Sequence, residues 1–168
     1  MFEFGFDLSG RGVLEGIRRG AGEDWNLPGE SNIPLVRKVI ERAESRIRIV
    51  TTDIQEELFG QPEIAELIER KLRSSVHLDV MAPHLEKAIS DPKLSRLRYW
   101  FRDRVGLYSL GSRVPRLQFM TVDGKHTLNR APDSTGSQVD IMIRYDDSKW
   151  CETWDRRFNV VMGTLPRL

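Results

Sequence analysis

The chain has 168 residues, of which 39% are hydrophobic and 30% charged, a balance typical of one globular domain and not of a disordered segment. No window approaches the roughly 18 uncharged apolar residues of a membrane span, and Met1 to Phe6 lack the basic and apolar regions of a secretory signal. Cys151 is the single cysteine, which excludes a disulfide or a Cys-based zinc site within one chain and favours a reducing, cytoplasmic location.

The net charge of +1 provides no overall field that would draw the protein to nucleic acid or to anionic lipid. The basic residues are nevertheless 20 Arg and 6 Lys. A GC-rich, prokaryotic genome explains this excess, and so does phosphate recognition by guanidinium groups. The three His have no ligand spacing, so we expect neither a metal nor another cofactor.

Residues 1–31 differ from the rest of the chain. Phe2, Phe4 and Phe6 alternate with Glu3 and Gly5, which is typical of a strand, and repeated glycines then interrupt any regular element. We predict an N-terminal strand and a Gly-rich loop or arm over 1–31, followed by an α/β domain over 32–168.

Helices and strands alternate in the first half of that domain. Pro34 opens an amphipathic helix, and β-branched residues indicate a strand over 46–52. Pro62 opens a second helix that continues to Leu72, and a second strand follows over 76–81. Strand, helix and strand at this spacing predict a βαβ unit with parallel strands.

The second half continues the pattern. Residues 85–104 are largely helical with a break near Asp91, and a third strand follows over 105–110. A strand over 115–122, the Asp123-Gly124 turn and a return strand over 126–130 predict a hairpin. The chain then forms one more strand over 139–143 and a helix that begins after an N-cap among Asp146, Asp147 and Ser148, with Trp150, Trp154 and Phe158 on one stripe. We expect this stripe to pack in the core, with a dimer interface as the alternative.

This order of elements resembles the phospholipase D-like superfamily. In that family a strand carries His and, two residues later, Lys; an Asp-Gly turn and a return strand with a Gly-Ser loop follow, and then a strand and a helix close the domain. The segments 139–147 and 154–158 are similar to the closing strand and helix, and 33–82 is similar to the opening elements. The resemblance implies an α/β fold with a mixed, largely parallel sheet and helices on both faces.

The motif residues themselves are replaced. Aligning Asp123-Gly124 with the family's Asp-Gly places Arg116 at the His position and Gln118 at the Lys position. Arg130 and Ala131 then stand at the Gly-Ser positions, and Asp133 at the Asn position. A protonated guanidinium is not a nucleophile, so we expect no phosphodiesterase activity of the family's type.

Three functional hypotheses follow. The first is a non-catalytic binding or regulatory module that binds a phosphate-containing ligand through Arg116, Gln118, Arg113 and Arg130, or contacts a protein partner. Because the family joins two such halves at one site, the resemblance also implies a homodimer. The second is a nucleic-acid-binding protein whose surface includes Arg96, Arg98, Trp100 and Arg102. The third is a divergent phosphodiesterase or nuclease that uses His126 and Asp123.

One further carboxylate stands at the end of a predicted strand. Asp53 follows the strand over 46–52, where α/β sheets place functional groups. We expect Asp53 to cap a helix rather than to act on a ligand.

Overall fold

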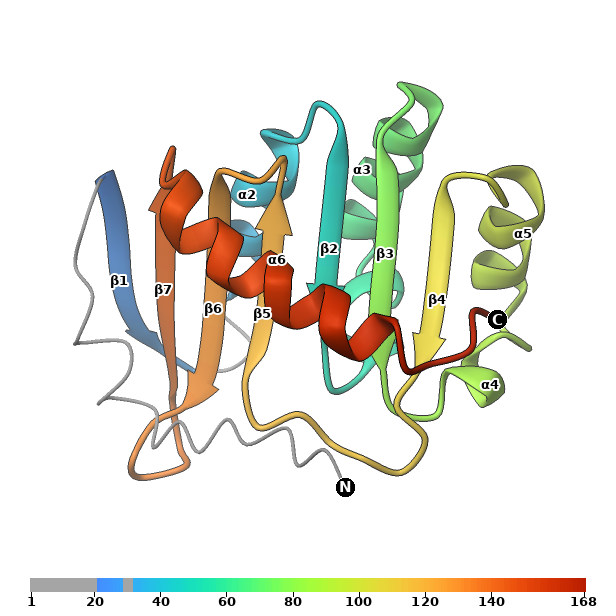
Figure 1. Cartoon of the computed structure of the whole chain (residues 1–168). Helices are drawn as coiled ribbons and strands as arrows, with labels where there is room; N and C mark the ends of the chain where they lie inside the picture. Colours follow the sequence, from blue (N-terminus) through green and yellow to red (C-terminus); the bar gives the residue numbers. More distant parts are fainter. Residues whose placement is uncertain (1–20, 29–31) are drawn as a thin grey trace.

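The computed structural model describes residues 21–28 and 32–168. They form one seven-stranded sheet with helices on both faces (Figure 1). The strand order is β1-β7-β6-β5-β2-β3-β4. The strands are β1 (Ala21–Leu27), β2 (Arg46–Val50), β3 (His77–Ala82), β4 (Val105–Ser109), β5 (Gln118–Val122), β6 (His126–Pro132) and β7 (Val139–Tyr145).

Helices cover the two faces unequally. The longest helix crosses one face alone, and the others lie behind the sheet in Figure 1 or at its β4 side. They are α2 (Ile33–Glu41), the π-helix η2 (Gln55–Phe59), α3 (Pro62–Arg73), α4 (Leu85–Ala88), α5 (Pro92–Trp100) and α6 (Ser148–Met162). The mixed α/β architecture is therefore as predicted.

The sheet contains less parallel pairing than we expected. β2–β3 and β3–β4 are parallel, as the βαβ pattern predicts, but the other four neighbouring pairs are antiparallel. The reason is the hairpin of β5 and β6. It packs beside β2 in the antiparallel direction, and β7 and β1 then continue outward from it.

Local sequence signals account for most element boundaries. Pro34 and Pro62 each occupy the first turn of their helix, where a missing backbone N–H costs no hydrogen bond. Asp91 and Asp147 accept hydrogen bonds from backbone N–H groups at the starts of α5 and α6. The hairpin turn contains Asp123 and Gly124, both with positive φ.

β1 is a correction to the prediction for the N-terminal region. Residues 21–27 were expected to be loop, but they pair along their whole length with β7. The prediction was wrong because the glycines were taken as a sign of a loop. Gly22 instead lies in a strand, where only glycine leaves room for the neighbouring Arg144 side chain. A Cβ at this position would lie 2.5 Å from Arg144 Nη1. The predicted strand at Phe2–Phe6 lies outside the described residues.

A row of aligned residues crosses all seven strands on the α6 face, with five polar side chains in the middle and a glycine at each end. Two neighbours in the row contact α6, because Arg48 Nη1 lies 3.0 Å from Asp155 Oδ1 and the Thr121 hydroxyl donates to the same oxygen at 2.5 Å. Glycines at both ends leave space for the charged side chains beside them. In sheet order the row is Gly22, Arg144, Thr127, Thr121, Arg48, Asp79 and Gly106.

α6 packs its apolar stripe onto this face, as predicted. Trp150, Cys151, Trp154 and Phe158 are buried, and the Trp154 ring lies 5.0 Å from that of Phe119. None of the helices in the described ranges is long and apolar enough to cross a membrane.

Candidate functional site

The first candidate site lies at the edge of the sheet where β2 ends and β5 begins. Gln118 and Arg130 are register partners on β5 and β6, and both side chains face the α2 and α3 side of the sheet. Thr51 and Thr52 follow β2 directly and reach the same place. The structure therefore brings together Gln118 and Arg130, two of the four residues predicted to bind an anion.

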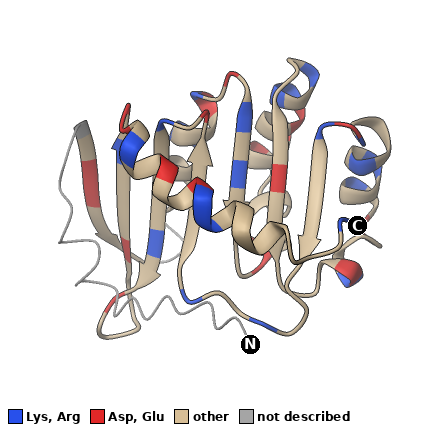
Figure 2. Cartoon of the chain, viewed as in Figure 1, with Lys and Arg blue, Asp and Glu red and all other residues tan. Residues whose placement is uncertain are grey.

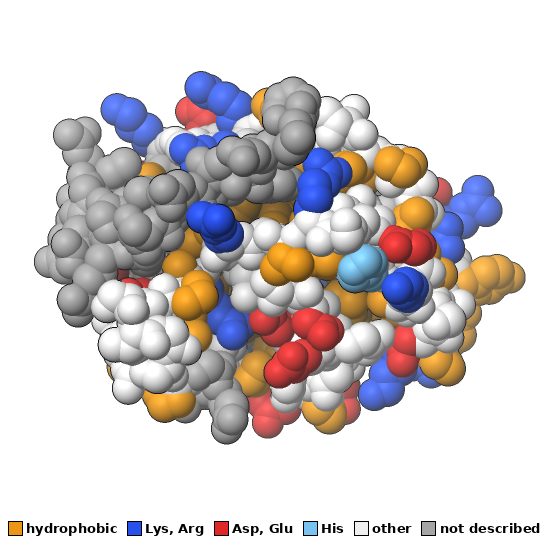
Figure 3. All heavy atoms as spheres, turned by 90° about the horizontal axis from the view of Figure 1, so that it is seen from below, with side chains coloured by type: hydrophobic (Ala, Val, Ile, Leu, Met, Phe, Trp, Pro, Cys, Tyr) orange, Lys and Arg blue, Asp and Glu red, His pale blue; other side chains and the backbone are white. Residues whose placement is uncertain are grey.

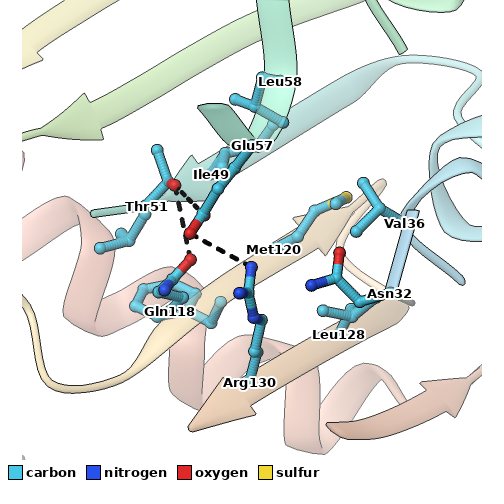
Figure 4. A pocket seen from close by; sticks show the side chains of 12 residues that line it. Asn32, Val36, Ile49, Thr51, Glu57, Leu58, Gln118, Met120, Leu128 and Arg130 are labelled. Carbon is cyan, nitrogen blue, oxygen red and sulfur yellow. Dashed lines mark hydrogen bonds and ion pairs between the residues drawn. The ribbon is translucent and has the colours of Figure 1, made fainter. Parts of the chain in front are cut away.

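A carboxylate from η2 occupies the centre of this group. Glu57 accepts a short hydrogen bond from the Thr51 hydroxyl and a second one, of 3.2 Å, from the Thr52 hydroxyl. Arg130 Nη1 lies 3.2 Å from Glu57 Oε1. The Gln118 amide completes the network by donating to the Thr52 hydroxyl at 3.1 Å. Figure 4 shows the side chains of Thr51, Glu57, Gln118 and Arg130 pointing toward one another.

The network leaves little room for a ligand. The remaining cavity measures about 30 Å³, which is space for about two water molecules. Glu57 and Arg130 are 17% and 16% exposed, so their charges are largely withdrawn from solvent. The pocket thus holds a cation and hydroxyl donors, as an anion site would, but the anion is supplied by the protein itself. We call this group of Thr51, Thr52, Glu57, Gln118 and Arg130 the Glu57 network.

The other two predicted anion-site residues lie in the loop before β5. Arg113 and Arg116 are exposed, and neither lies in a strand, because β5 begins only at Gln118. A strand over 115–122 was predicted, but it begins three residues later, after Pro115, which lacks a backbone N–H. Figure 3 views this edge and shows acidic side chains gathered together, with Lys and Arg side chains spaced apart.

The hairpin turn lies at the opposite edge of the sheet. There the Asp123 carboxylate accepts hydrogen bonds from the backbone N–H groups of Glu44, Ser45 and Arg46 and from the Ser45 hydroxyl, all at 2.7–2.8 Å. Burial alone would raise the pKa of Asp123, but these hydrogen bonds outweigh burial and hold its pKa below the ordinary value. Asp123 thus ties the β5–β6 hairpin to the start of β2.

His126 lies near Asp123 but is 5% exposed. Its Nδ1 accepts a hydrogen bond of 3.1 Å from the backbone N–H of Asp146, and burial lowers the pKa of the imidazole. His126 is therefore a neutral, structural side chain, and the geometry does not favour the divergent enzyme. Asp53 accepts from the N–H groups of Gln55 and Glu56, which confirms its predicted capping role, here at a π-helix.

The second candidate site is the outer surface of α5. Leu94 and Leu97 face the core, while Tyr99 and Trp100 are 79% and 56% exposed. Arg96 lies over the Trp100 ring, 5.6 Å from its centroid. The turn after α5 adds Arg102, which is 82% exposed. We call the group of Arg96, Arg98, Tyr99, Trp100 and Arg102 the α5 surface; Figure 2 shows the basic residues along this helix.

Sequence reasoning missed two contributors to these sites. Glu57 lies in an acidic stretch between a strand and Pro62, and nothing in its spacing distinguishes it from Glu56. Arg167, far from α5 in sequence, donates from Nη2 to the carbonyls of Arg102 and Val105 at 2.8 Å. Only the folded chain reveals either contact.

In comparisons with known proteins, no protein-family model and no curated protein sequence matches the chain. Solved structures do match it. The chain is similar to TrmBL2, an archaeal chromatin protein described as showing a novel mode of DNA binding, with a TM-score of 0.67 and 13% identity over 87% of this chain and 55% of that one. It therefore spans about half of that protein.

Two further structures extend the comparison. Nuc from Salmonella typhimurium, a phospholipase D family member, matches with a TM-score of 0.65 and 12% identity over 88% of this chain and 97% of that one. Phosphatidylserine synthase from Haemophilus influenzae Rd KW20 matches with a TM-score of 0.64 and 9% identity over 88% of this chain and 39% of that one. The element order, the hairpin and these structural matches together establish that the chain adopts a phospholipase D-like α/β fold.

Proposed function

We propose that the protein is a non-catalytic nucleic-acid-binding module of phospholipase D-like fold, which binds its ligand on the α5 surface. The absence of catalysis is supported by the residues at the family's reactive positions. Arg116 cannot attack phosphorus, and Gln118 carries no positive charge. Glu57 adds a negative charge where a phosphodiester would have to enter. A carboxylate at that position repels phosphate instead of stabilising it.

The α5 surface carries the proposal because it combines exposed guanidinium groups with exposed aromatic rings. Arg98, in the last turn of α5, and Arg102, in the turn that follows the helix, line the same groove and can both contact phosphates along a strand. Tyr99 and Trp100 have little contact with the core, so their apolar rings remain in water unless a partner covers them. Basic residues interleaved with aromatic residues are the arrangement that binds a sugar–phosphate backbone together with its bases.

One structural neighbour gives independent support. TrmBL2 is a chromatin protein with a novel mode of DNA binding, and the match covers most of the present chain. A phospholipase D-like fold therefore occurs in at least one DNA-binding protein. At 13% identity the match supports nucleic-acid binding as such, and the choice of the α5 surface rests on its own exposed residues.

The proposal is tested by measuring the affinity for labelled DNA and RNA over a series of salt concentrations. We expect the affinity to fall as salt rises, because phosphate contacts release counterions. Replacing both Arg98 and Arg102 by Gln should weaken binding to all sequences and reduce the slope of log affinity against log salt by about 1 for each lost phosphate contact.

The matched control removes two exposed arginines elsewhere. Arg37 on α2 and Arg156 on α6 are 47% and 75% exposed, and replacing both by Gln changes the net charge by the same amount. An equal loss of affinity in this control would show that binding depends on overall charge. No binding by the wild-type protein at low salt would refute the proposed function.

A further inference from the structure

A groove separates α5 from the C-terminal residues of the chain. It encloses about 400 Å³, which is within the size range of sites for small organic ligands. Its walls are polar or basic over much of their length. The lining residues are Ser95, Arg98, Tyr99, Arg102, Val105, Arg167 and Leu168.

The C-terminal wall of the groove is held in place by backbone contacts. Tyr108 and Arg167 form an antiparallel bridge, and the backbone N–H of Leu168 donates to the Leu107 carbonyl at 2.9 Å. Arg167 also donates from its guanidinium to the carbonyls of Arg102 and Val105. The terminal segment therefore pairs with the outer edge of β4, and the groove has two positioned walls.

The chemistry of the groove is that of an anion bound beside a planar group. Arg98, Arg102 and Arg167 contribute three guanidinium groups, and no acidic residue of the described chain lines the groove. Tyr99, which is 79% exposed, contributes an aromatic ring to the groove. By contrast, Trp100 lies outside the groove and already stacks with Arg96.

These features distinguish between forms of nucleic acid. Phosphate contacts alone require charges and no exposed ring, whereas stacking on an aromatic ring requires an unpaired base, because base faces in a duplex are already covered by their neighbours. We infer that the groove takes one unpaired nucleotide, with its phosphate held by the arginines and its base stacked on Tyr99, so that the protein prefers single-stranded nucleic acid. This inference rests on the proposed function and adds the class of ligand.

The test compares a short oligothymidylate with a duplex of the same length at the same salt concentration. We expect tighter binding of the single strand. Tyr99→Ala should lower single-strand affinity roughly five- to a hundred-fold, the usual effect of losing one stacked base, and should leave duplex affinity unchanged. Tyr99→Phe keeps the ring and should bind as the wild type does.

Two controls make the result specific. Trp25→Ala removes another exposed aromatic residue, 43% exposed on β1, and should not change the affinity. Photo-crosslinking with 5-iodouracil in the oligonucleotide, followed by mass spectrometry, should attach the base to Tyr99. Unfolding curves of each variant establish that the fold is intact.

The outcomes separate the two proposals. If single strand and duplex bind equally and Tyr99→Ala has no effect, but the Arg98 and Arg102 variants weaken both, the inference fails and the proposed function stands. If no nucleic acid binds, both fail. If an acidic peptide binds the groove as tightly as the oligonucleotide does, and independently of Tyr99, the groove recognises charge alone and the inference is overturned.

Discussion

Replacing Glu57 by Gln should destabilise the protein by about 2–3 kcal/mol. Glutamine has nearly the same shape, but it removes the charge that faces Arg130. Breaking one side of a fully buried ion pair costs about 3–5 kcal/mol. The side chains of Glu57 and Arg130 are still 17% and 16% exposed, so water can solvate part of the charge that is left unpaired. The expected loss of stability is therefore smaller than that of a fully buried pair.

The assay is equilibrium unfolding in urea followed by circular dichroism. With an m-value of about 2–3 kcal/mol per molar, the midpoint should fall by about 1 M. Glu152→Gln breaks a surface pair with Arg156 whose side chains are 65% and 75% exposed, and it should leave the midpoint almost unchanged.

A double-mutant cycle provides the decisive comparison. Arg130→Gln alone should also be destabilising, but the double variant should cost less than the sum of the two single variants, because no unpaired charge remains. If Glu57→Gln is as stable as the wild type, or if the two costs simply add, the reasoning about the Glu57 network is refuted.

A smaller side chain at position 57 tests the predicted anion site. Glu57→Ala removes both the charge and the volume of the carboxylate, so Arg130, Gln118 and the two threonines become available to an external anion. If the pocket binds anions, inorganic phosphate should raise the unfolding midpoint of Glu57→Ala more than that of the wild type, because a ligand stabilises the state that binds it. The wild type controls for the general stabilising effect of phosphate. Equal shifts in both proteins would count against an anion site.

Three other predictions follow from single contacts. Asp123→Asn should lower the free energy of unfolding by about 1–2 kcal/mol. Folding lowers the pKa of Asp123, so the stabilisation by its carboxylate is present above the unfolded pKa and is lost at lower pH. The difference in stability between this variant and the wild type should therefore shrink below about pH 4. A difference that persists at low pH would contradict this. Burial raises the pKa of the Cys151 thiol to about 12, so a thiol reagent should modify it only after unfolding, and rapid labelling of the native protein would refute the burial. Gly106→Ala would place a Cβ 2.3 Å from Asp79 Oδ1 and should lower the melting temperature. If this clash is the cause, a variant that also carries Asp79→Ala should recover part of the loss. An unchanged melting temperature of Gly106→Ala would contradict the prediction.

The predicted homodimer has its own measurement. Size-exclusion chromatography with light scattering gives the mass of the particle in solution, and a mass twice that of the 19.4 kDa chain would support it. A single-chain mass at all concentrations tested would contradict it.

The sequence by itself determined the local elements and the kind of fold. Pro34 and Pro62 mark helix starts because proline suits a first turn, and Asp123-Gly124 marks the hairpin because both residues tolerate positive φ. The stripe of Trp150, Trp154 and Phe158 has the spacing of one helix face and is buried as that spacing predicts. These features depend on residues close together in the chain, which is why they can be read without a structure.

The tertiary structure alone decided the sheet order and the state of the pocket. β1 became part of the sheet because it pairs with β7, more than a hundred residues away. Glu57 closed the pocket because a π-helix after β2 positions it against a side chain from β6. The groove beside α5 exists because Arg167 returns to the edge of β4. Each depends on contacts between distant segments, and the periodicity of neighbouring residues carries no information about such contacts.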